Sequence, residues 1–256
     1  MRIAVPLFLV LLLGGVAHAQ IVNVQGALAK APTKNGVDGT ITFNLGWSDG
    51  NAPSFNMAGS GTVVWKHDDF LTLAVVSGEY GTALHVVNTK KTFEHLRERV
   101  RVTDRWRWEL FGQHEYDEFR RLSFRALLGT GPAFQILNKP DYGLLAGVAY
   151  MLDVERLDDR ESATDSGRET TEHRFSAYVT GHEKVIQNVT FVQTMYAQPK
   201  IDDAANYRLL GEAALLVKLS KRYALTNGLV IGYDSRPPQQ IRRFDSSLKV
   251  GLVVTL

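Results

Sequence analysis

The chain closes with the stretch FDSSLKVGLVVTL, residues 244–256, in which two kinds of side chain alternate. One face of an extended chain would carry Phe244, Ser246, Leu248, Val250, Leu252, Val254 and Leu256, and the other Asp245, Ser247, Lys249, Gly251, Val253 and Thr255. Successive side chains of a β-strand point to opposite sides, so the pattern predicts a strand with one apolar face and one polar or small face. The apolar face runs to the last residue, where soluble chains commonly fray.

The same alternation recurs upstream of this terminal strand. Seven further segments show it clearly: 40–48, 55–65, 106–110, 121–128, 144–152, 207–219 and 223–233. Four more show it less regularly: 70–86, 91–102, 170–181 and 185–197. In the second of these, Glu98 interrupts an otherwise apolar face that contains Leu96 and Val100. Together the segments predict about twelve strands, with ten as the alternative, and an even number suits a barrel whose ends lie on one side.

We therefore expect an all-β chain that folds as one antiparallel transmembrane β-barrel over residues 37–256. Aromatic residues such as Trp47, Trp65 and Trp106 fall near segment ends, where the aromatic girdles of membrane barrels lie. The alternative is a soluble periplasmic barrel or sandwich, whose core face would alternate in the same way. Bulky apolar faces on nearly every segment favour the membrane barrel.

Polar links separate the segments and predict the turns. Tight turns are expected at 66–69, 103–105, 138–141, 181–184 and 220–222, which are rich in Asp, Asn, Lys, Ser and Pro. Longer loops are expected at 154–169 and 234–242. Short turns on the periplasmic side and long loops outside are typical of outer-membrane barrels.

The chain begins with Arg2, an apolar run over residues 3–16 and the small-residue pattern Ala17-His18-Ala19. This predicts a signal peptide over 1–19, followed by an N-terminal periplasmic segment over 20–36. An uncleaved anchor is the alternative, but the apolar run is shorter than the roughly 20 residues a spanning helix needs. Export to a bacterial outer membrane follows from the two patterns together.

Charge and cysteine content limit the partners. The 29 Lys and Arg nearly balance the 27 Asp and Glu, which excludes a concentrated basic surface for nucleic acid. There are no cysteines, so no disulfide can stabilise the fold. Expected partners are outer-membrane lipid, lipopolysaccharide and, during biogenesis, the barrel-assembly machinery; the oligomeric state stays open.

The central stretch FGQHEYDEFRRLSFR, residues 111–125, with Gly129-Thr130-Gly131 after it, resembles the YdiY-like salt-induced outer-membrane proteins, a family of unknown molecular function. The likeness is an acidic residue, an Asp with a following aromatic, an Arg on the next strand and then glycines. It covers residues 105–157 well and most of the mature chain loosely. Pro132 departs from the pattern, and Leu256 replaces the terminal Phe of many outer-membrane barrels. The resemblance implies an outer-membrane location and a link to salt or osmotic stress, and no reaction.

Charged residues gather on the predicted inward faces of the central strands. The lumen-facing candidates are Arg97, Arg99, Arg101, Arg107, Glu109, Arg121 and Arg125. One interpretation is an anion-attracting constriction of a narrow pore. The other, which we favour, is a self-neutralised plug whose ion pairs fill the lumen. Gly129, Gly131, Gly143 and Gly147 share the inward side of two adjacent strands, where we expect a structural role.

No residue set predicts catalysis, a cofactor or a metal. His173 and Ser176 are three apart and would face opposite sides of a strand, so they fail as a base and nucleophile. His114 with Glu115, Asp117 and Glu118 is expected at a solvated extracellular loop rather than as a metal site. Asp158, Asp159 and Asp165 are at most a weak site for a divalent cation bridging to lipopolysaccharide.

We therefore expect a non-enzymatic barrel, either linked to salt stress or forming a narrow pore for small polar or anionic solutes. The alternatives are a surface hydrolase acting on lipid or peptide and a soluble periplasmic binding module.

Overall fold

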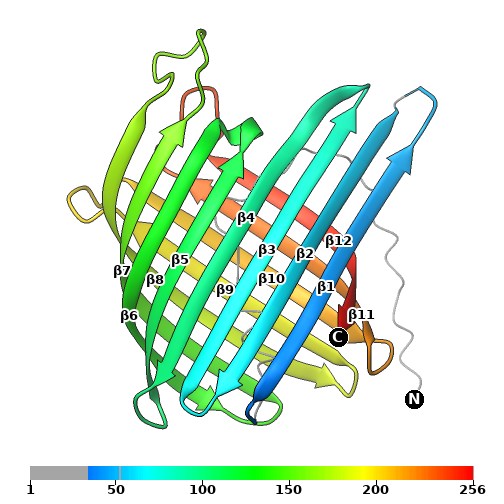
Figure 1. The fold of residues 1–256 in the computed structure, drawn as a ribbon, viewed down its shortest axis with the longest axis vertical. Helices are drawn as coiled ribbons and strands as arrows, with labels where there is room; N and C mark the ends of the chain where they lie inside the picture. Colours follow the sequence, from blue (N-terminus) through cyan, green and yellow to red (C-terminus); the bar gives the residue numbers. More distant parts are fainter. Residues whose placement is uncertain (1–33, 52, 256) are drawn as a thin grey trace, which may run out of the picture.

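The structure, a computed structural model, describes residues 34–51 and 53–255, and over these it is a closed antiparallel barrel of twelve strands (Figure 1). The strands are β1 (Gly36–Ser48), β2 (Ser54–His67), β3 (Phe70–Ala83), β4 (Val86–Arg101), β5 (Trp106–Asp117), β6 (Leu122–Asn138), β7 (Tyr142–Leu157), β8 (Glu169–Ile186), β9 (Val189–Pro199), β10 (Tyr207–Lys218), β11 (Tyr223–Asp234) and β12 (Phe244–Thr255). A short 3₁₀ helix, η1 (Glu118–Arg120), joins β5 to β6. In the described part of the chain, no helix is long and apolar enough to cross a membrane.

Each strand pairs with its neighbours in the chain, and β1 pairs with β12 to close the barrel. The predicted twelve-strand antiparallel barrel is therefore confirmed, and the four less regular segments form β3, β4, β8 and β9. The predicted signal peptide and most of the segment over 20–36 lie outside the described residues. We call the side that carries the β7–β8 link the loop side, and the side that carries the β2–β3 link the turn side (Figure 1).

The outer surface of the barrel is apolar. Large apolar side chains are exposed on all twelve strands; on β1 these are Ile41, Phe43, Leu45 and Trp47, and on β5 Trp106, Trp108 and Leu110. Soluble monomers rarely expose an apolar patch beyond a few hundred Å², because contact with water is unfavourable. A surface of this kind around a closed sheet matches the acyl chains of a bilayer.

Three local predictions were wrong. The turn expected at 181–184 lies inside β8, and the chain reverses instead at 187–188. Simple alternation along 121–128 predicts that Leu122 faces outward with Phe124, Ala126 and Leu128, but Leu122 is buried, because register shifts in the pairing of β6 with both neighbours turn it inward. His114 lies within β5 rather than in a loop. Glu98, the charged residue that interrupts the apolar face of β4, does face outward, where its carboxylate accepts a hydrogen bond of 2.5 Å from the Thr72 hydroxyl.

Three of the inward glycines, Gly129, Gly143 and Gly147, lie under aromatic rings from a neighbouring strand. A Cβ atom at Gly129 would lie 2.2 Å from Cζ of Phe111, and one at Gly147 would lie 2.4 Å from Cε1 of Tyr178. Any other residue would push these rings off the sheet, so the glycines allow the rings to lie flat against the wall. This explains the structural role expected for the glycine patch.

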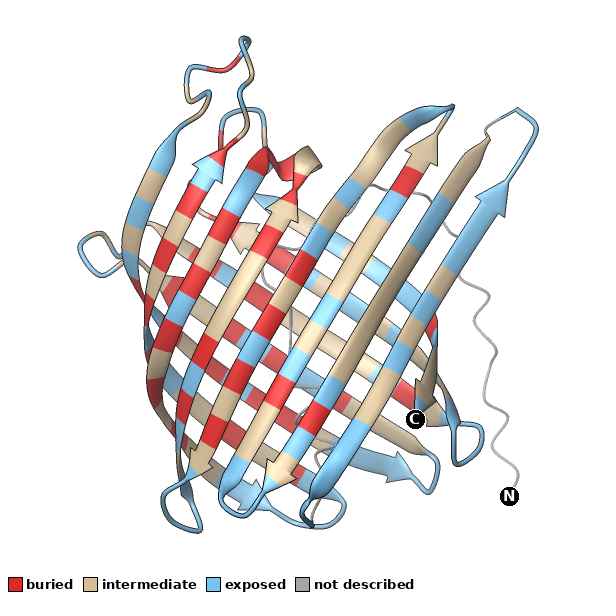
Figure 2. Ribbon diagram, viewed as in Figure 1, coloured by how far each residue is buried: buried red, intermediate tan, exposed pale blue. Residues whose placement is uncertain are grey.

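Burial is unequal around the barrel. Figure 2 shows buried residues gathered on the central strands, from β4 onward, while β1 and β2 are mostly exposed or intermediate. Within the described residues, β1 holds no buried residue and β12 holds only Gly251. Side chains therefore fill the lumen against the central strands and leave it more open near the strands that close the barrel.

Candidate functional site

The first buried ion cluster joins β4, β5 and β8; we call it the Glu109 cluster. Alternation on β4 directs Arg97 and Arg99 inward, and the register places Arg99 directly opposite Glu109 on β5. Glu109 accepts hydrogen bonds of 2.7 Å from Nη1 of Arg97 and 2.7 Å from Nε of Arg99. The hydroxyl of Tyr178 on β8 donates a third, of 2.8 Å. Only 2% of Glu109 is exposed, so this carboxylate depends on these donors.

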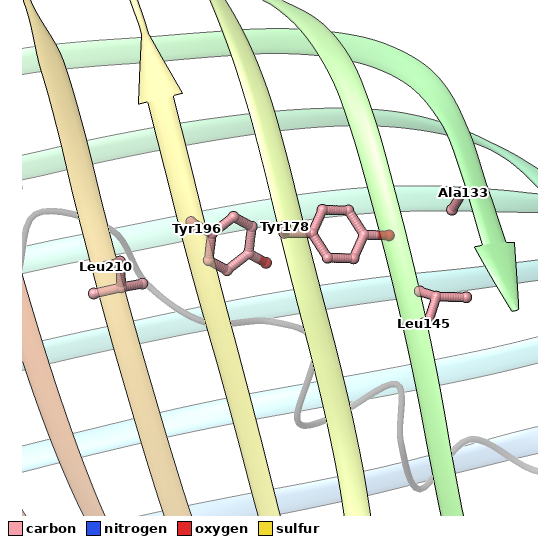
Figure 3. Close-up of a cluster of buried hydrophobic side chains, with 5 residues drawn as sticks. All are labelled: Ala133, Leu145, Tyr178, Tyr196 and Leu210. Atoms are coloured by element: carbon pink, nitrogen blue, oxygen red, sulfur yellow. The ribbon is translucent and has the colours of Figure 1, made fainter. Parts of the chain in front are cut away.

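An apolar layer packs beside the Glu109 cluster. The guanidinium of Arg97 lies 4.6 Å from the centre of the Phe111 ring, a cation–π contact. Tyr178 packs against Tyr196, with 5.4 Å between the ring centres and 39° between the ring planes. Figure 3 shows these two rings in a band with Ala133, Leu145 and Leu210 across neighbouring strands. This band holds the Tyr178 ring in place, so its hydroxyl is fixed over Glu109.

The second buried cluster surrounds Asp153 on β7; we call it the Asp153 cluster. Arg125 on β6 binds the Asp153 carboxylate with two hydrogen bonds, of 3.1 and 2.9 Å. Arg208 on β10 binds it at 2.8 Å and also reaches Glu155 at 2.9 Å and Asp234 at 3.1 Å. Arg174 on β8 lies 3.7 Å away. Each buried arginine has a carboxylate partner, and the planar guanidinium suits such paired contacts.

The structure brings together only part of the predicted lumen ladder. Arg97, Arg99, Glu109 and Arg125 lie in the two buried clusters, in the arrangement of a self-neutralised plug rather than of a free cationic ring. Arg101 lies exposed at the turn side, where it pairs with Asp69 in the β2–β3 link. Arg107 is half-buried at the same end of the lumen, and its Nη1 has no hydrogen-bond partner among the described residues.

Arg121 was predicted to face the lumen, and this was wrong. It follows η1 in the left-handed backbone conformation, with φ of 61°, and lies at the loop side outside the strands. Its fully buried side chain binds Asp158 at 2.8 Å and Asp165 at 2.5 Å, both in the β7–β8 link. It also donates to the carbonyl of Gln239 in the β11–β12 link, at 3.1 Å. We call this arrangement the loop latch, because one arginine ties three loops together.

The loop latch is expected to open in acid. Desolvation alone raises the pKa of Asp165, but the Gln239 N–H and the Arg121 guanidinium outweigh it and hold that pKa below its ordinary value. A lowered folded-state pKa contributes stability above the ordinary pKa of Asp, which is lost as the pH falls through the lowered value. Spin labels on Glu161→Cys and Arg242→Cys should give a narrow distance distribution at pH 6 and a broad one at pH 2.

The matched control for the latch carries the same two labels with Arg121→Gln. Its distance distribution should be broad at pH 6 as well, because the two carboxylates then lack their shared cation. A distribution that stays narrow in this variant would contradict the latch.

The open part of the lumen is a cavity of about 320 Å³ beside β1–β5 and β10–β12; we call it the lumen cavity. Its lining is mostly small and polar: Thr42, Asn44, Ala58, Gly59, Ser60, Thr62, Val75, Ser77, Gly78, Glu79, Lys91, Thr92, Phe93, Glu115, Glu212, Thr226, Gly228, Val230, Ser247, Lys249 and Gly251. Glu79 lies between two ammonium groups: Lys91 at 3.2 Å, and Lys249, which reaches it from β12. The hydroxyl groups of the lining, together with the charged side chains of Glu79, Lys91 and Lys249, can replace the water molecules that hydrate a small polar solute.

The described part of the chain holds no group of three or more His, Cys, Asp or Glu side chains that could bind a metal ion. His173 faces outward against the Tyr150 hydroxyl, whereas Ser176 faces inward and binds Gln198 at 3.3 Å. His114 pairs with Glu94 at 2.7 Å on the outer surface. Asp158 and Asp165 bind Arg121, which occupies the place a cation would take.

Sequence reasoning missed most of the Asp153 cluster and the whole lumen cavity. Asp153 and Glu155 are two residues apart on one strand, so alternation alone would have predicted that both side chains face the lumen. Alternation on β8 and β10 would likewise have placed Arg174 and Arg208 on the inward face. The lumen cavity has a weaker signal: the Thr, Ser, Asn and Gly residues that alternate with apolar residues on β1, β2 and β12.

The sequence pattern of the family described as "Protein of unknown function, DUF481" matches residues 41–256. Among curated proteins, none matches the chain.

Solved outer-membrane proteins share the fold. An outer-membrane channel from Pseudomonas putida F1 is 8% identical, with a TM-score of 0.51, covering 88% of this chain and 97% of the channel. The translocator domain of the autotransporter NalP from Neisseria meningitidis is 12% identical, with a TM-score of 0.49 and coverage of 90% and 91%. The NanC porin is 13% identical, with a TM-score of 0.48 and coverage of 86% and 98%. At these identities the channel from P. putida establishes a likeness of fold alone.

Proposed function

Because the chain belongs to the DUF481 family, whose description assigns no activity, we propose a function from the geometry: a narrow outer-membrane pore for small polar solutes. The observation that carries this proposal is the division of the lumen. Paired charges fill the part along β4–β10, while the lumen cavity stays open along the other wall. A uniformly filled barrel would have no path for a solute, whereas this one has a polar space beside its plug.

The charges of the lumen cavity favour weak ion selectivity. Lys91 and Lys249 bracket Glu79, and two further carboxylates, Glu115 and Glu212, line the same cavity. Glu115 is paired with the buried Arg120, so the lining has no marked excess of either charge, and small polar solutes are the proposed cargo. The buried arginines of the plug each bind a carboxylate and lie outside this path.

The remaining parts of the proposal concern location and partners. The apolar outer surface supports a place in the bacterial outer membrane, in contact with lipid and lipopolysaccharide, after insertion by the barrel-assembly machinery. A non-enzymatic role is supported by His173 and Ser176, because the histidine faces outward and the serine faces the lumen, so they cannot act together as base and nucleophile. A role in salt or osmotic stress is supported by the YdiY-like stretch over 105–157, and would require expression to rise when salt is added.

Planar bilayers test the pore directly. The wild-type barrel should show discrete conductance steps, and Gly228→Trp should reduce their size several-fold. Gly228 lies on the inward side of β11 and lines the lumen cavity, and a Cβ there would meet nothing within 4 Å, so the indole has room to enter the path.

The matched control is Gly211→Trp, which places the same side chain on the outward side of β10, where a Cβ also meets nothing within 4 Å. Its conductance should equal that of the wild type. A silent wild-type barrel that is correctly folded, or equal conductance in the two tryptophan variants, would exclude the proposed path.

A further inference from the structure

The join between β1 and β12 is incomplete. Among the described residues it contains four pairs, from Thr40 with Thr255 to Phe43 with Leu252. Every other neighbouring pair of strands is joined over a longer stretch; β1 and β2, for example, pair from Gly36 to Ser48. The register of β1 with β12 would continue toward the loop side by placing 44–47 opposite 248–251, but these stretches do not pair with each other. In Figure 1 the end of β1 stands apart from β12.

An opening of this kind is unfavourable if it only faces lipid. Unsatisfied backbone N–H and C=O groups in the hydrocarbon region are each unfavourable by several kcal/mol, so irregular backbone is tolerated where it lines a polar cavity. The two edges meet that condition, because Asn44 on β1 and Lys249 and Gly251 on β12 line the lumen cavity directly behind them. The unpaired stretch therefore lies between the lumen cavity and the membrane, and the side chain of Asn44 lies against Gly251 within it.

The polarity changes across this opening. On the outer side, Leu45 and Trp47 on β1 and Leu248 and Val250 on β12 are all at least half exposed. On the inner side, the side chain of Lys249 is 45% exposed and its ammonium contacts Glu79, which Lys91 also contacts. Apolar contacts outside and a cation inside match a molecule with an acyl chain and an anionic head.

We propose that the wall opens laterally between β1 and β12, and that a single-chain amphiphile binds there with its anionic head at Lys249 and its acyl chain in the membrane. The lumen cavity, of about 320 Å³, accommodates a head group but no acyl chain as well. A lipid with two chains would have to bring its glycerol and both chains to the gap. A fatty acid and a lysophospholipid share the required chemistry, and the experiment below distinguishes them.

Pairs of introduced cysteines test the opening, and because the chain has no native cysteines, any disulfide within one chain must join the two introduced residues. Leu45→Cys with Val250→Cys should form little disulfide under mild oxidation in vesicles, because the two edges are not joined. The matched control is Ile41→Cys with Val254→Cys, which are partners four residues along each strand, on the same face and at the same type of pair. It should form the disulfide readily. Equal yields for the two pairs would show a closed wall and overturn the proposal.

Spin-labelled lipids test the ligand. A bimane on Ser247→Cys, inside the opening, should be quenched saturably by 5-doxyl-stearate, and Lys249→Gln should weaken the apparent affinity at least five-fold. A bimane on Ser246→Cys, which faces outward on the next position, should be quenched without saturation by doxyl-stearate and by doxyl-phosphatidylcholine alike. Unlabelled oleate and lysophosphatidylglycerol are then compared as competitors, and the stronger one identifies the source of the anionic head.

Three results would overturn the proposal that a single-chain amphiphile binds here. The first is that a two-chain doxyl lipid quenches the Ser247→Cys label as strongly as doxyl-stearate does. The others are that Lys249→Gln has no effect on the apparent affinity, or that the label is not quenched at all. The last would favour a strand of another protein at the two edges. Conductance is measured separately, so a silent barrel that binds the amphiphile would refute the pore and leave this inference standing.

Discussion

Glu109→Gln is expected to lower the free energy of unfolding by about 3–5 kcal/mol, the range for breaking a buried ion pair from one side. The amide keeps the shape of the side chain but leaves Arg97 and Arg99 as neighbouring buried cations without their shared carboxylate. Urea unfolding of the reconstituted barrel measures the loss. The control is Glu161→Gln in the exposed β7–β8 link, which should change stability by no more than about 0.5 kcal/mol.

A further variant shows whether the loss comes from unpaired charge. Adding Arg97→Met and Arg99→Met to Glu109→Gln should recover part of the stability, because well-packed apolar side chains often replace a buried ion cluster without loss. A loss below about 1 kcal/mol in the single variant would mean that water or another group already satisfies the two arginines, and the plug would not depend on Glu109.

Glu79→Gln is expected to have the opposite profile: a large change in ion selectivity with a small change in stability. Glu79 is the carboxylate between Lys91 and Lys249 in the lumen cavity, and its side chain is 22% exposed, so solvent screens the two ammonium groups when it is neutralised. Two free cations along the path should raise the anion-to-cation permeability ratio several-fold, measured from the reversal potential in a KCl gradient.

Glu109→Gln is the matched comparison, since it removes the same charge from the plug. If solutes pass through the lumen cavity, its permeability ratio should stay close to that of the wild type. Equal shifts in the two variants would show that ions pass by the plug as well, and no shift in Glu79→Gln would place the path elsewhere.

The strands of this barrel were predictable because alternation is a local property of the chain. Counting in twos from Leu256 or from Trp106 assigns each side chain to a face, and Arg97, Arg99, Glu109 and Arg125 were placed inward in this way. The exceptions lie where the count is broken: the left-handed residue Arg121 and the register shifts around Leu122 remove the simple parity.

Partners across the lumen were not predictable in the same way. Arg208 lies on β10 and Asp153 on β7, and their contact depends on barrel curvature and on the register of the strands between them. Alternation in the sequence predicts which face of the sheet each side chain lies on, but not its position along the barrel axis. The same limit applies to the opening between β1 and β12, since residues 44–47 and 248–251 alternate as regularly as any paired strand.

The two buried clusters also set an order for assembly. The ion pairs of Glu109 with Arg97 and Arg99 lie within one hairpin, so they form as soon as β4 meets β5. Arg208 likewise meets Asp234 within the β10–β11 hairpin, but it reaches Asp153 and Glu155 only when β7 is in place as well. A half-built sheet would therefore lack two of the three carboxylate contacts of this buried guanidinium. The second half of the barrel gains this part of its stability when distant strands meet rather than hairpin by hairpin.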